Sequence, residues 1–361
     1  MGNCLITKLK GIINNDNLPI FNVVKLHVNG VGETTSGYQR ELTVKADGIV
    51  NVTVSSGGEF TVGSPSGATK TSYQISNTTA VLYFKDADYD IYLENKGNIV
   101  ELYTHRLYGE KKIISIDTKQ IDYCQKLKVF DFAVTDSTGD LKFFKNCPVI
   151  EEIEFQGSHI GGDLANISEC ATLKLLKPSL NTFGDINSIA GLTNLESFVT
   201  SENQNIYGSI TGLSSLTKLV FFNILGSHNI DGNLTGLANA SHIVTLNVMS
   251  TKVEGNIDSL VTLIDATYLN LYNNIIAGTV EGFIGSKAKP ANPISMFRLI
   301  QYASLGGKKH SAGNCFLTWD NANNVAVYEG GNSVADCPRV YTKGSPTGDF
   351  TNKTVIPVEN L

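Results

Sequence analysis

Apolar residues and glycines recur at a nearly constant spacing between residues 130 and 290. Seven segments have the form apolar-x-Gly-x-apolar, with glycines at positions 139, 162, 184, 208, 232, 255 and 278. The first and third segments carry Ser137 and Thr182 where the leading apolar residue is expected. Self-similarity at such a period indicates a solenoid. One unit of this size cannot bury its own apolar face, so stacking must supply the core and both ends need caps.

Each period contains the same elements in the same order. We expect a short strand before each glycine, as at Ile153–Phe155, Leu246–Val248 and Leu269–Leu271, a turn at the glycine, and a helix-like or irregular arm after it, as at Leu213–Leu219. The fullest copy reads Leu269-x-Leu271-x-x-Asn274-x-Ile276-x-Gly278-x-Val280. This is the leucine-rich-repeat pattern, and its ending resembles the plant-like subclass. A parallel β-helix is the alternative solenoid.

The resemblance implies a parallel sheet on the concave side, leucines in the interior, and an asparagine that bonds backbone groups in each turn. Only the copy from Leu269 to Val280 has the asparagine. At that position we place Ser137, Ser158, Gln204, His228 and Thr251 in other copies. The sequence therefore predicts that the asparagine ladder is mostly absent.

Three cysteines share the period of the repeats. Cys124, Cys147 and Cys170 lie 23 residues apart, which predicts that they stack at equivalent interior positions. Buried thiols of this kind act as small apolar side chains. A metal site is not expected, because the cysteines line up along the solenoid axis and no histidine shares their period.

The remaining segments extend the repeats at both ends. Alternating residues predict a small all-β domain at 21–110, with strands at Val24–Val28, Val50–Val54 and Ile91–Leu93 and a hairpin turn at Asn95–Asn98. The solenoid then occupies 111–305, beginning with a cap that contains Ile113, Ile114, Ile116 and Ile121. After a last strand at Phe297–Leu299, a hairpin of Cys315–Trp319 with Val325–Tyr328 and an extended tail form a C-terminal β cap at 306–361. The predicted fold class is a mainly β or α-β solenoid between two smaller β units.

The N-terminal segment, residues 1–20, is too apolar for a free tail and too short to fold alone, so we expect it to dock on its own domain or on a partner. Its Asn3-Cys4-Leu5-Ile6-Thr7-Lys8-Leu9-Lys10 and Asn15-Asp16-Asn17-Leu18-Pro19 resemble the opening of virion proteins of Bacteroides phages, including crAss-like phages. This resemblance covers under a tenth of the chain and implies an attachment element. The attachment residues are Cys4, Leu5, Ile6, Lys8, Leu9, Leu18 and Pro19.

The net charge and the lengths of the apolar runs limit the classes of partner that the chain can bind. The net charge of −6 argues against nucleic acid or an anionic membrane as the main partner. No apolar run approaches the roughly 20 residues that a membrane-spanning helix needs, and no signal peptide is visible. The resemblance of the opening segment implies a virion protein, made in the bacterial cytoplasm, that contacts capsid or tail subunits and other copies of itself. The alternative location is the bacterial cell surface.

No motif for enzymatic chemistry is present: phosphate-binding loops, HExxH, GxSxG and paired CxxC are absent. Asp140, Asp163 and Asp185 form a row before the second apolar residue of each motif. Such a row could suggest a polysaccharide-cleaving groove, but general acid/base work needs two carboxylates in different environments. We expect these aspartates to bond local backbone, and neither a cofactor nor a metal is predicted.

Binding is the remaining role. We predict a non-enzymatic fibre or head/tail decoration subunit, whose solenoid mediates protein contact or adhesion to a host-surface protein or glycan. A bacterial surface adhesin is the alternative. Outward residues of the concave strands would form the binding face: Glu152, Glu154, Gln156, Thr200, Asn247, Met249, Tyr268, Asn270 and Tyr272.

Overall fold

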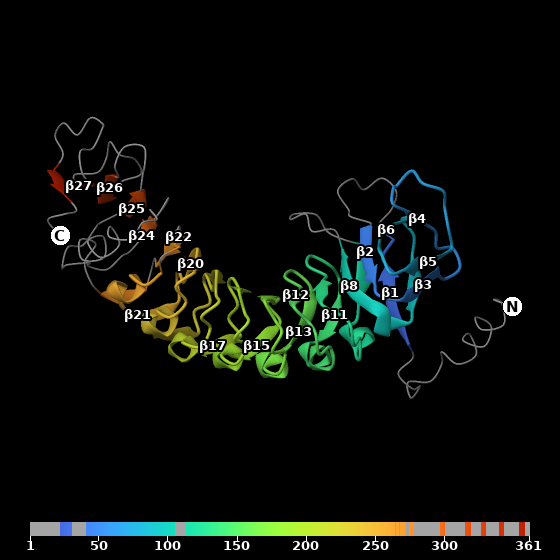
Figure 1. Ribbon diagram of the computed structural model, residues 1–361, viewed down its shortest axis with the longest axis horizontal. Helices are drawn as coiled ribbons and strands as arrows, with labels where there is room; N and C mark the ends of the chain where they lie inside the picture. The colour runs from blue at the N-terminus through green and yellow to red at the C-terminus, as the bar shows by residue number, and fades with distance from the viewer. Residues whose placement is uncertain are drawn as a thin grey trace.

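The computed structural model shows a two-layer β domain that runs into a curved stack of coils (Figure 1). It describes residues 22–30, 41–104 and 113–277 without 264, 267, 272 and 273, and the backbone of five later strands. The N-terminal attachment segment and Tyr272 lie outside the described residues. Among the described residues no helix is long and apolar enough to span a membrane.

Each coil contributes one strand to a sheet on the concave side of the stack. The strands pair in parallel from β8 to β22. They are β8 Ile99–Thr104, β10 Val129–Asp131, β12 Glu152–Glu154, β14 Leu175–Lys177, β16 Ser197–Val199, β18 Phe221–Asn223, β20 Thr245–Asn247 and β22 Tyr268–Asn270. This confirms the predicted concave strands to within a residue.

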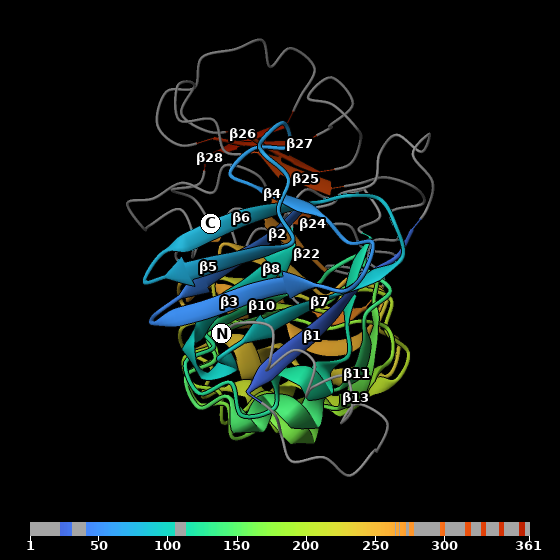
Figure 2. The ribbon, with the colours of Figure 1, turned by 90° about the vertical axis from the view of Figure 1, so that its right-hand side faces the viewer.

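The glycine segments are also strands, which the sequence reasoning missed. They form a second, lateral sheet of parallel strands along one flank of the stack (Figure 2). Its members are β11 Thr138–Asp140, β13 His159–Asp163, β15 Thr182–Asp185, β17 Ile206–Ser209, β19 Ile230–Asn233, β21 Lys252–Asn256 and β23 Ile275–Ala277. The expectation of turns at the glycines was therefore wrong.

Close contact between coils explains why glycine stands in these strands. Gly162 has φ +116°, and a Cβ there would lie 2.8 Å from Asp140 Oδ1 on the preceding coil. Gly184, Gly208, Gly232 and Gly255 share the positive φ and meet the equivalent side chain of the preceding coil. An L-residue is disfavoured in this conformation, so the repeated glycine is a requirement of stacking.

A short 3₁₀ helix follows each lateral strand from β11 to β21 and begins the return to the concave sheet, and η2 takes the same place after β9 Ile114–Ile116 in the first coil. The helices are η2 Thr118–Ile121, η3 Leu141–Asn146, η4 Leu164–Ile167, η5 Ile186–Ile189, η6 Ile210–Leu213, η7 Leu234–Leu237 and η8 Ile257–Leu260. The residue before each helix accepts a hydrogen bond from the backbone N–H two positions later, as Asp163 does from Ala165 N at 2.9 Å. Two sheets joined by a 3₁₀ arm distinguish this solenoid from the β-helix alternative.

The core is a column of apolar side chains shared between neighbouring coils. Phe130, Ile153, Leu176, Phe198 and Phe222 are adjacent in register on consecutive concave strands, and each is fully buried. Burial of one such side chain contributes about 1.5–3 kcal/mol. Since each coil packs on the next, the stability of a coil depends on its neighbours.

A polar column runs beside this core and corrects the predicted asparagine ladder. It consists of Thr135, Ser158, Ser179, Asn203, Ser227, Thr251 and Asn274, all buried. Asn203 Nδ2 donates to the carbonyls of Ser179 and Thr182 at 3.1 and 2.9 Å, so Asn274 is not the only ladder asparagine. Gln204 and His228 were wrong by one residue, because these coils have one more residue between the column and the glycine. Ser137 was wrong by two residues, since the column position of its coil is Thr135.

The N-terminal domain has two sheets, one of which continues the concave sheet. Its strands are β1 Val23–Val28, β2 Glu41–Ala46, β3 Ile49–Val54, β4 Phe60–Val62, β5 Ser72–Ser76, β6 Thr79–Phe84, β7 Tyr89–Glu94, β8 and β9 Ile114–Ile116. Strand β8 pairs in parallel with β10 and antiparallel with β2, so the concave sheet runs on through β2, β6 and β4. The outer sheet has the order β5-β3-β7-β1-β9, and one hydrophobic cluster spans both parts.

Two predictions in this region need correction. Strands β7 and β8 are not a hairpin, because Asn95 at φ 65° and the 3₁₀ turn η1 Lys96–Asn98 carry the chain from one layer to the other. The segment expected as a cap follows the coil pattern itself: Asp117 caps η2, and Cys124 begins the thiol stack. The β domain covers this first coil through β1 and β2, which pair with β9 and β8.

A fourth sheet lies beyond the solenoid in the chain, in the order β24-β25-β26-β27-β28. Its strands are β24 Phe297–Leu299, β25 Cys315–Thr318, β26 Ala326–Glu329, β27 Arg339–Thr342 and β28 Thr354–Pro357. The antiparallel pairing of β25 with β26 confirms the predicted hairpin. Strand β28, in the segment predicted as an extended tail, pairs in parallel with β27.

Candidate binding surface

The concave sheet presents two rows of outward side chains, one on each side of the buried core position. One row contains Val129, Glu152, Leu175, Ser197, Phe221, Thr245 and Tyr268. The other contains Asp131, Glu154, Lys177, Val199, Asn223, Asn247 and Asn270. The concave face is hereafter the surface made by these two rows. Its chemistry changes along the stack.

The coils near the N-terminal domain form its ionic part. Glu154 and Lys177 are adjacent in register and make an ion pair at 2.8 Å, with side chains only 13% and 18% exposed. At the edge of the sheet Glu151 lies between Lys128 and Lys174, at 2.9 and 2.8 Å. Hydrogen bonds from these two lysines lower the pKa of the Glu151 carboxyl. Much of the charge in this part is therefore already paired.

The later coils combine rings with amides. Phe221, the first residue of β18, is 38% exposed on this face. Asn223, Asn247 and Asn270 are neighbours in register. The Oδ1 atoms of Asn223 and Asn247 accept from the backbone N–H groups two residues later, at 3.1 and 3.3 Å. These bonds orient both amides, and the half-buried Asn223 keeps an Nδ2 group that could donate to a ligand.

Not all predicted residues lie where they were expected. The binding-face position given to Thr200 is wrong: it follows the end of β16, points inward like Phe198 two residues before it, and is 1% exposed. Asn247 and Asn270 are on the concave face but only 7% and 3% exposed. Asn270 Nδ2 donates to the Tyr268 hydroxyl at 3.2 Å.

Other predicted residues remain partly accessible. Glu152, Gln156, Met249 and Tyr268 are half-buried, and Gln156 Nε2 donates to the Val199 carbonyl at 3.4 Å. The sequence reasoning missed Phe221, the most exposed ring of the face. Aligning the strand starts would have found it, because Phe221 precedes the buried Phe222 as Tyr268 precedes Leu269.

The residues considered for catalysis have structural roles. The Oδ1 atoms of Asp140, Asp163 and Asp185 accept from Lys142 N, Ala165 N and Asn187 N at 2.8–2.9 Å, which confirms that these aspartates bond local backbone. Ser209, Asn233 and Asn256 cap later helices in the same way, so the position does not require a carboxylate. Within the part of the chain that the structure describes, no three metal-ligating side chains converge.

The thiol column is confirmed as part of the core. Cys124, Cys147 and Cys170 are free thiols that are at most 5% exposed. Burial raises the pKa of Cys124 to about 12 and that of Cys170 to about 11, and it raises the pKa of Cys147 as well. Thiols that stay protonated are poor nucleophiles, so these cysteines serve packing.

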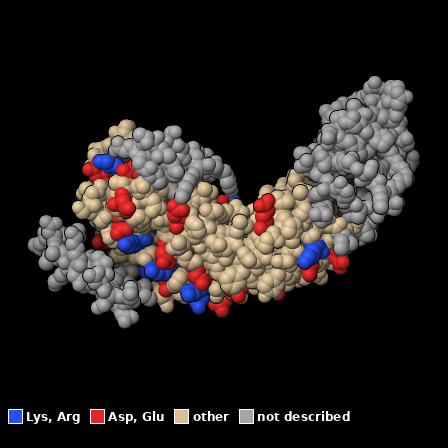
Figure 3. Space-filling view, turned by 180° about the vertical axis from the view of Figure 1, so that it is seen from behind, with Lys and Arg blue, Asp and Glu red and all other residues tan. Residues whose placement is uncertain are grey.

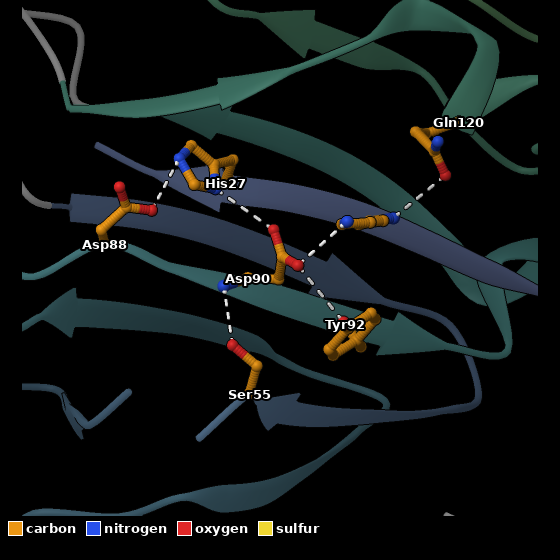
Figure 4. Close-up of polar contacts among 7 residues, drawn as sticks. His27, Ser55, Asp88, Asp90, Tyr92 and Gln120 are labelled. Carbon is orange, nitrogen blue, oxygen red and sulfur yellow. Dashed lines mark hydrogen bonds and ion pairs between the residues drawn. The ribbon is translucent and has the colours of Figure 1, made fainter. Parts of the chain in front are cut away.

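On the face shown in Figure 3, most of the charged side chains of the described residues lie over the β domain and the first coils. On the outer sheet of that domain His27 lies between Asp88 and Asp90, at 3.3 and 3.1 Å, and Lys25 Nζ is 2.9 Å from Asp90 (Figure 4). Burial alone would raise the pKa of Asp90, but hydrogen bonds from Lys25 and His27 outweigh it and lower the pKa. This cluster is a polar sheet face whose charges are mutually paired.

Each coil repeats one leucine-rich pattern, and the coils stack in parallel with their strands in register, which identifies the fold. The chain has the leucine-rich-repeat fold. The plant peptide hormone receptor RGFR1, solved in complex with RGF2, is 19% identical, with 57% of this chain and 36% of that one covered and a TM-score of 0.46. An internalin C2 of Listeria monocytogenes is 24% identical over 50% of this chain and 75% of its own, with a TM-score of 0.36. A leucine-rich-repeat protein of Leptospira interrogans is 16% identical over 55% and 53%, with a TM-score of 0.38.

The chain spans between 26% and 37% of the length of three receptor structures that it matches. No protein-family model and no curated protein sequence matches it.

Proposed function

We propose that the chain is a non-enzymatic binding protein that presents its concave face to another protein. The observation that carries this proposal is Phe221, a ring 38% exposed at the start of β18, beside a row of asparagines. An exposed large apolar side chain on a strand does not contribute to the hydrophobic core. An aromatic ring beside oriented asparagine amides is typical of a surface that binds another protein.

We further propose that the protein is a virion subunit, a fibre or a head or tail decoration protein, anchored by residues 1–20. The support for this part is the resemblance of the opening segment to virion proteins. The partner of the concave face would then be a capsid or tail subunit, or another copy of this chain.

The virion role is tested with particles from the source organism. Epitope-tagged full-length protein and a variant lacking residues 2–20 are supplied during infection, and purified particles are probed for the tag. Incorporation of the full-length protein alone is expected. Equal incorporation of both would refute the anchor, and label on intact uninfected cells would favour a bacterial surface adhesin instead.

The concave-face role is tested separately with purified proteins. Capsid and tail subunits of the same particle, and the chain itself, are assayed for binding by interferometry. We expect Phe221→Ser to weaken the interaction at least about tenfold, as loss of a central ring does in other interfaces. The matched control is Tyr123→Asn, which removes a ring 47% exposed on the loop after η2 at a positive φ that asparagine tolerates. Equal affinities for Phe221→Ser and the control would contradict the proposal.

A further inference from the structure

The lateral sheet carries an exposed apolar cluster on two neighbouring coils. Leu180, Tyr207 and Phe183 are 57%, 54% and 48% exposed, the three highest values among large apolar side chains of the described residues. Asn205 Nδ2 on the next coil donates to the Leu180 carbonyl at 2.9 Å, which places Leu180 beside β17. Single exposed apolar residues are ordinary, but a contiguous group marks an interaction site.

Comparison with the other coils shows that the rings are not needed for the fold. The outward position that Phe183 and Tyr207 occupy is Thr138 in β11, Asp231 in β19 and Glu254 in β21. All these strands have the same backbone and the same glycine. The rings are therefore confined to two coils for a reason other than stacking.

Carboxylates alternate with these rings. Asp163 is the register neighbour of Phe183, and Asp185 is the register neighbour of Tyr207, which places each pair about 4.8 Å apart across the sheet. Each aspartate uses Oδ1 to cap its helix, and the second oxygen keeps its accepting capacity. Strands β13, β15, β17 and β19 contain no Lys or Arg.

We propose that this lateral patch, formed by Leu180, Phe183, Tyr207, Asp163 and Asp185, docks a basic segment of a partner protein. An arginine or lysine of that segment lies over a ring and pairs with the adjacent carboxylate, which combines a cation–π contact with an ion pair. An apolar residue of the segment packs on Leu180. This site is on a different face from the concave one, so its test does not depend on the proposed function.

The test uses the full chain and a fluorescein-labelled peptide of alternating arginine and leucine, with binding measured by anisotropy at about 0.15 M salt. Peptides with glutamate or serine in place of arginine are the ligand controls. We expect binding of the arginine peptide alone. The double variants Phe183→Thr/Tyr207→Thr and Asp163→Asn/Asp185→Asn should each weaken it at least about tenfold.

The repeats supply conservative variants and a matched control. Threonine is native at the ring position in β11, and asparagine caps the equivalent helices at Asn233 and Asn256, so both double variants should fold, as circular dichroism would verify. Asp140→Asn changes a capping aspartate whose register neighbour is Gly161, and it should leave the affinity unchanged.

Three results would overturn the proposal. The first is no binding of the arginine peptide up to about 1 mM. The second is a loss of affinity in Asp140→Asn as large as that in the Asp163→Asn/Asp185→Asn variant. The third is binding of a neutral glucan oligosaccharide that the Phe183→Thr/Tyr207→Thr variant abolishes although it still binds the peptide. The second result would indicate diffuse charge attraction, and the third would indicate a glycan site.

Discussion

Replacement of a repeat glycine tests whether stacking depends on the close approach of coils. In Gly162→Ala, the new Cβ would lie 2.8 Å from Asp140 Oδ1 and 3.1 Å from Leu141 N, on a backbone with φ +116°. The unfavourable backbone conformation costs about 1–3 kcal/mol. Displacement of the Asp140 cap adds about 1 kcal/mol. We therefore expect the free energy of unfolding to fall by about 2–4 kcal/mol.

Two other glycines separate these contributions. Gly57 has φ +87° with nothing within 4 Å of a built Cβ, whereas a Cβ at Gly191 meets only the Ser168 carbonyl at 4.0 Å. Gly57→Ala should report the backbone cost alone, about 1 kcal/mol. Gly191→Ala should change stability by no more than about 0.5 kcal/mol.

Urea unfolding followed by far-ultraviolet circular dichroism gives the midpoint and slope for each variant. A double-mutant cycle of Gly162→Ala with Asp140→Ala should show a favourable coupling of about 1 kcal/mol, because removal of the carboxylate relieves the contact. A loss in Gly162→Ala no larger than in Gly57→Ala, with no coupling to position 140, would refute the account of the repeat glycine.

Three further predictions concern caps, acid stability and thiols. Asp163→Ala should lower the free energy of unfolding by about 0.5–2 kcal/mol, because alanine cannot accept the hydrogen bond from Ala165 N. Asp163→Asn keeps an accepting oxygen and should not lower it. Equal urea midpoints for the two variants would contradict this prediction. Because the folded pKa of Asp90 is depressed, its contribution to stability is complete above the unfolded value near 3.8 and is lost as pH falls through the folded pKa. Asp90→Asn should therefore flatten the acid limb of a stability-versus-pH curve below that value, and an unchanged limb would count against it. Iodoacetamide at pH 8 should leave Cys124, Cys147 and Cys170 unmodified in the folded protein and alkylate them in urea, as peptide mass mapping would show; rapid modification without urea would contradict their burial.

Local sequence patterns were enough to predict the repeated coil and the residues buried inside it. The glycine period predicted the stack, the L-x-L alternation predicted the concave strands, and the equal spacing of Cys124, Cys147 and Cys170 predicted a buried column. All are confirmed because each depends on a position within one repeat. Asp140, Asp163 and Asp185 were correctly interpreted as backbone partners for the same reason.

Predictions failed where contacts between coils or layers decide the outcome. A glycine in a strand and a glycine in a turn look alike in sequence, so the lateral sheet was missed. The ladder position was assigned to Gln204 and not to Asn203, since one extra residue before the glycine shifts the column without changing the apolar pattern. Thr200 was assigned to the surface because it is polar, yet the hydroxyl fits the inward position after Phe198.

The two candidate binding surfaces also divide into residues that the sequence predicted and residues that only the structure brought together. The sequence led to Glu154, Tyr268 and the amides of the concave face, but Phe221 and the lateral patch became visible only once strands were aligned in space. A ring at position 183 and a carboxylate at position 163 are far apart in the chain and adjacent in the sheet.

By itself, the sequence determined that this protein is a solenoid of similar coils, because the period, the apolar alternation and the glycine positions are properties of one repeat. Only the tertiary structure decided that the first coil continues into the β domain through β8, that the glycines build a second sheet, and which side chains gather on each face. Those outcomes depend on the register between strands about 20 or more residues apart, and register is set by packing across coils that no local pattern encodes.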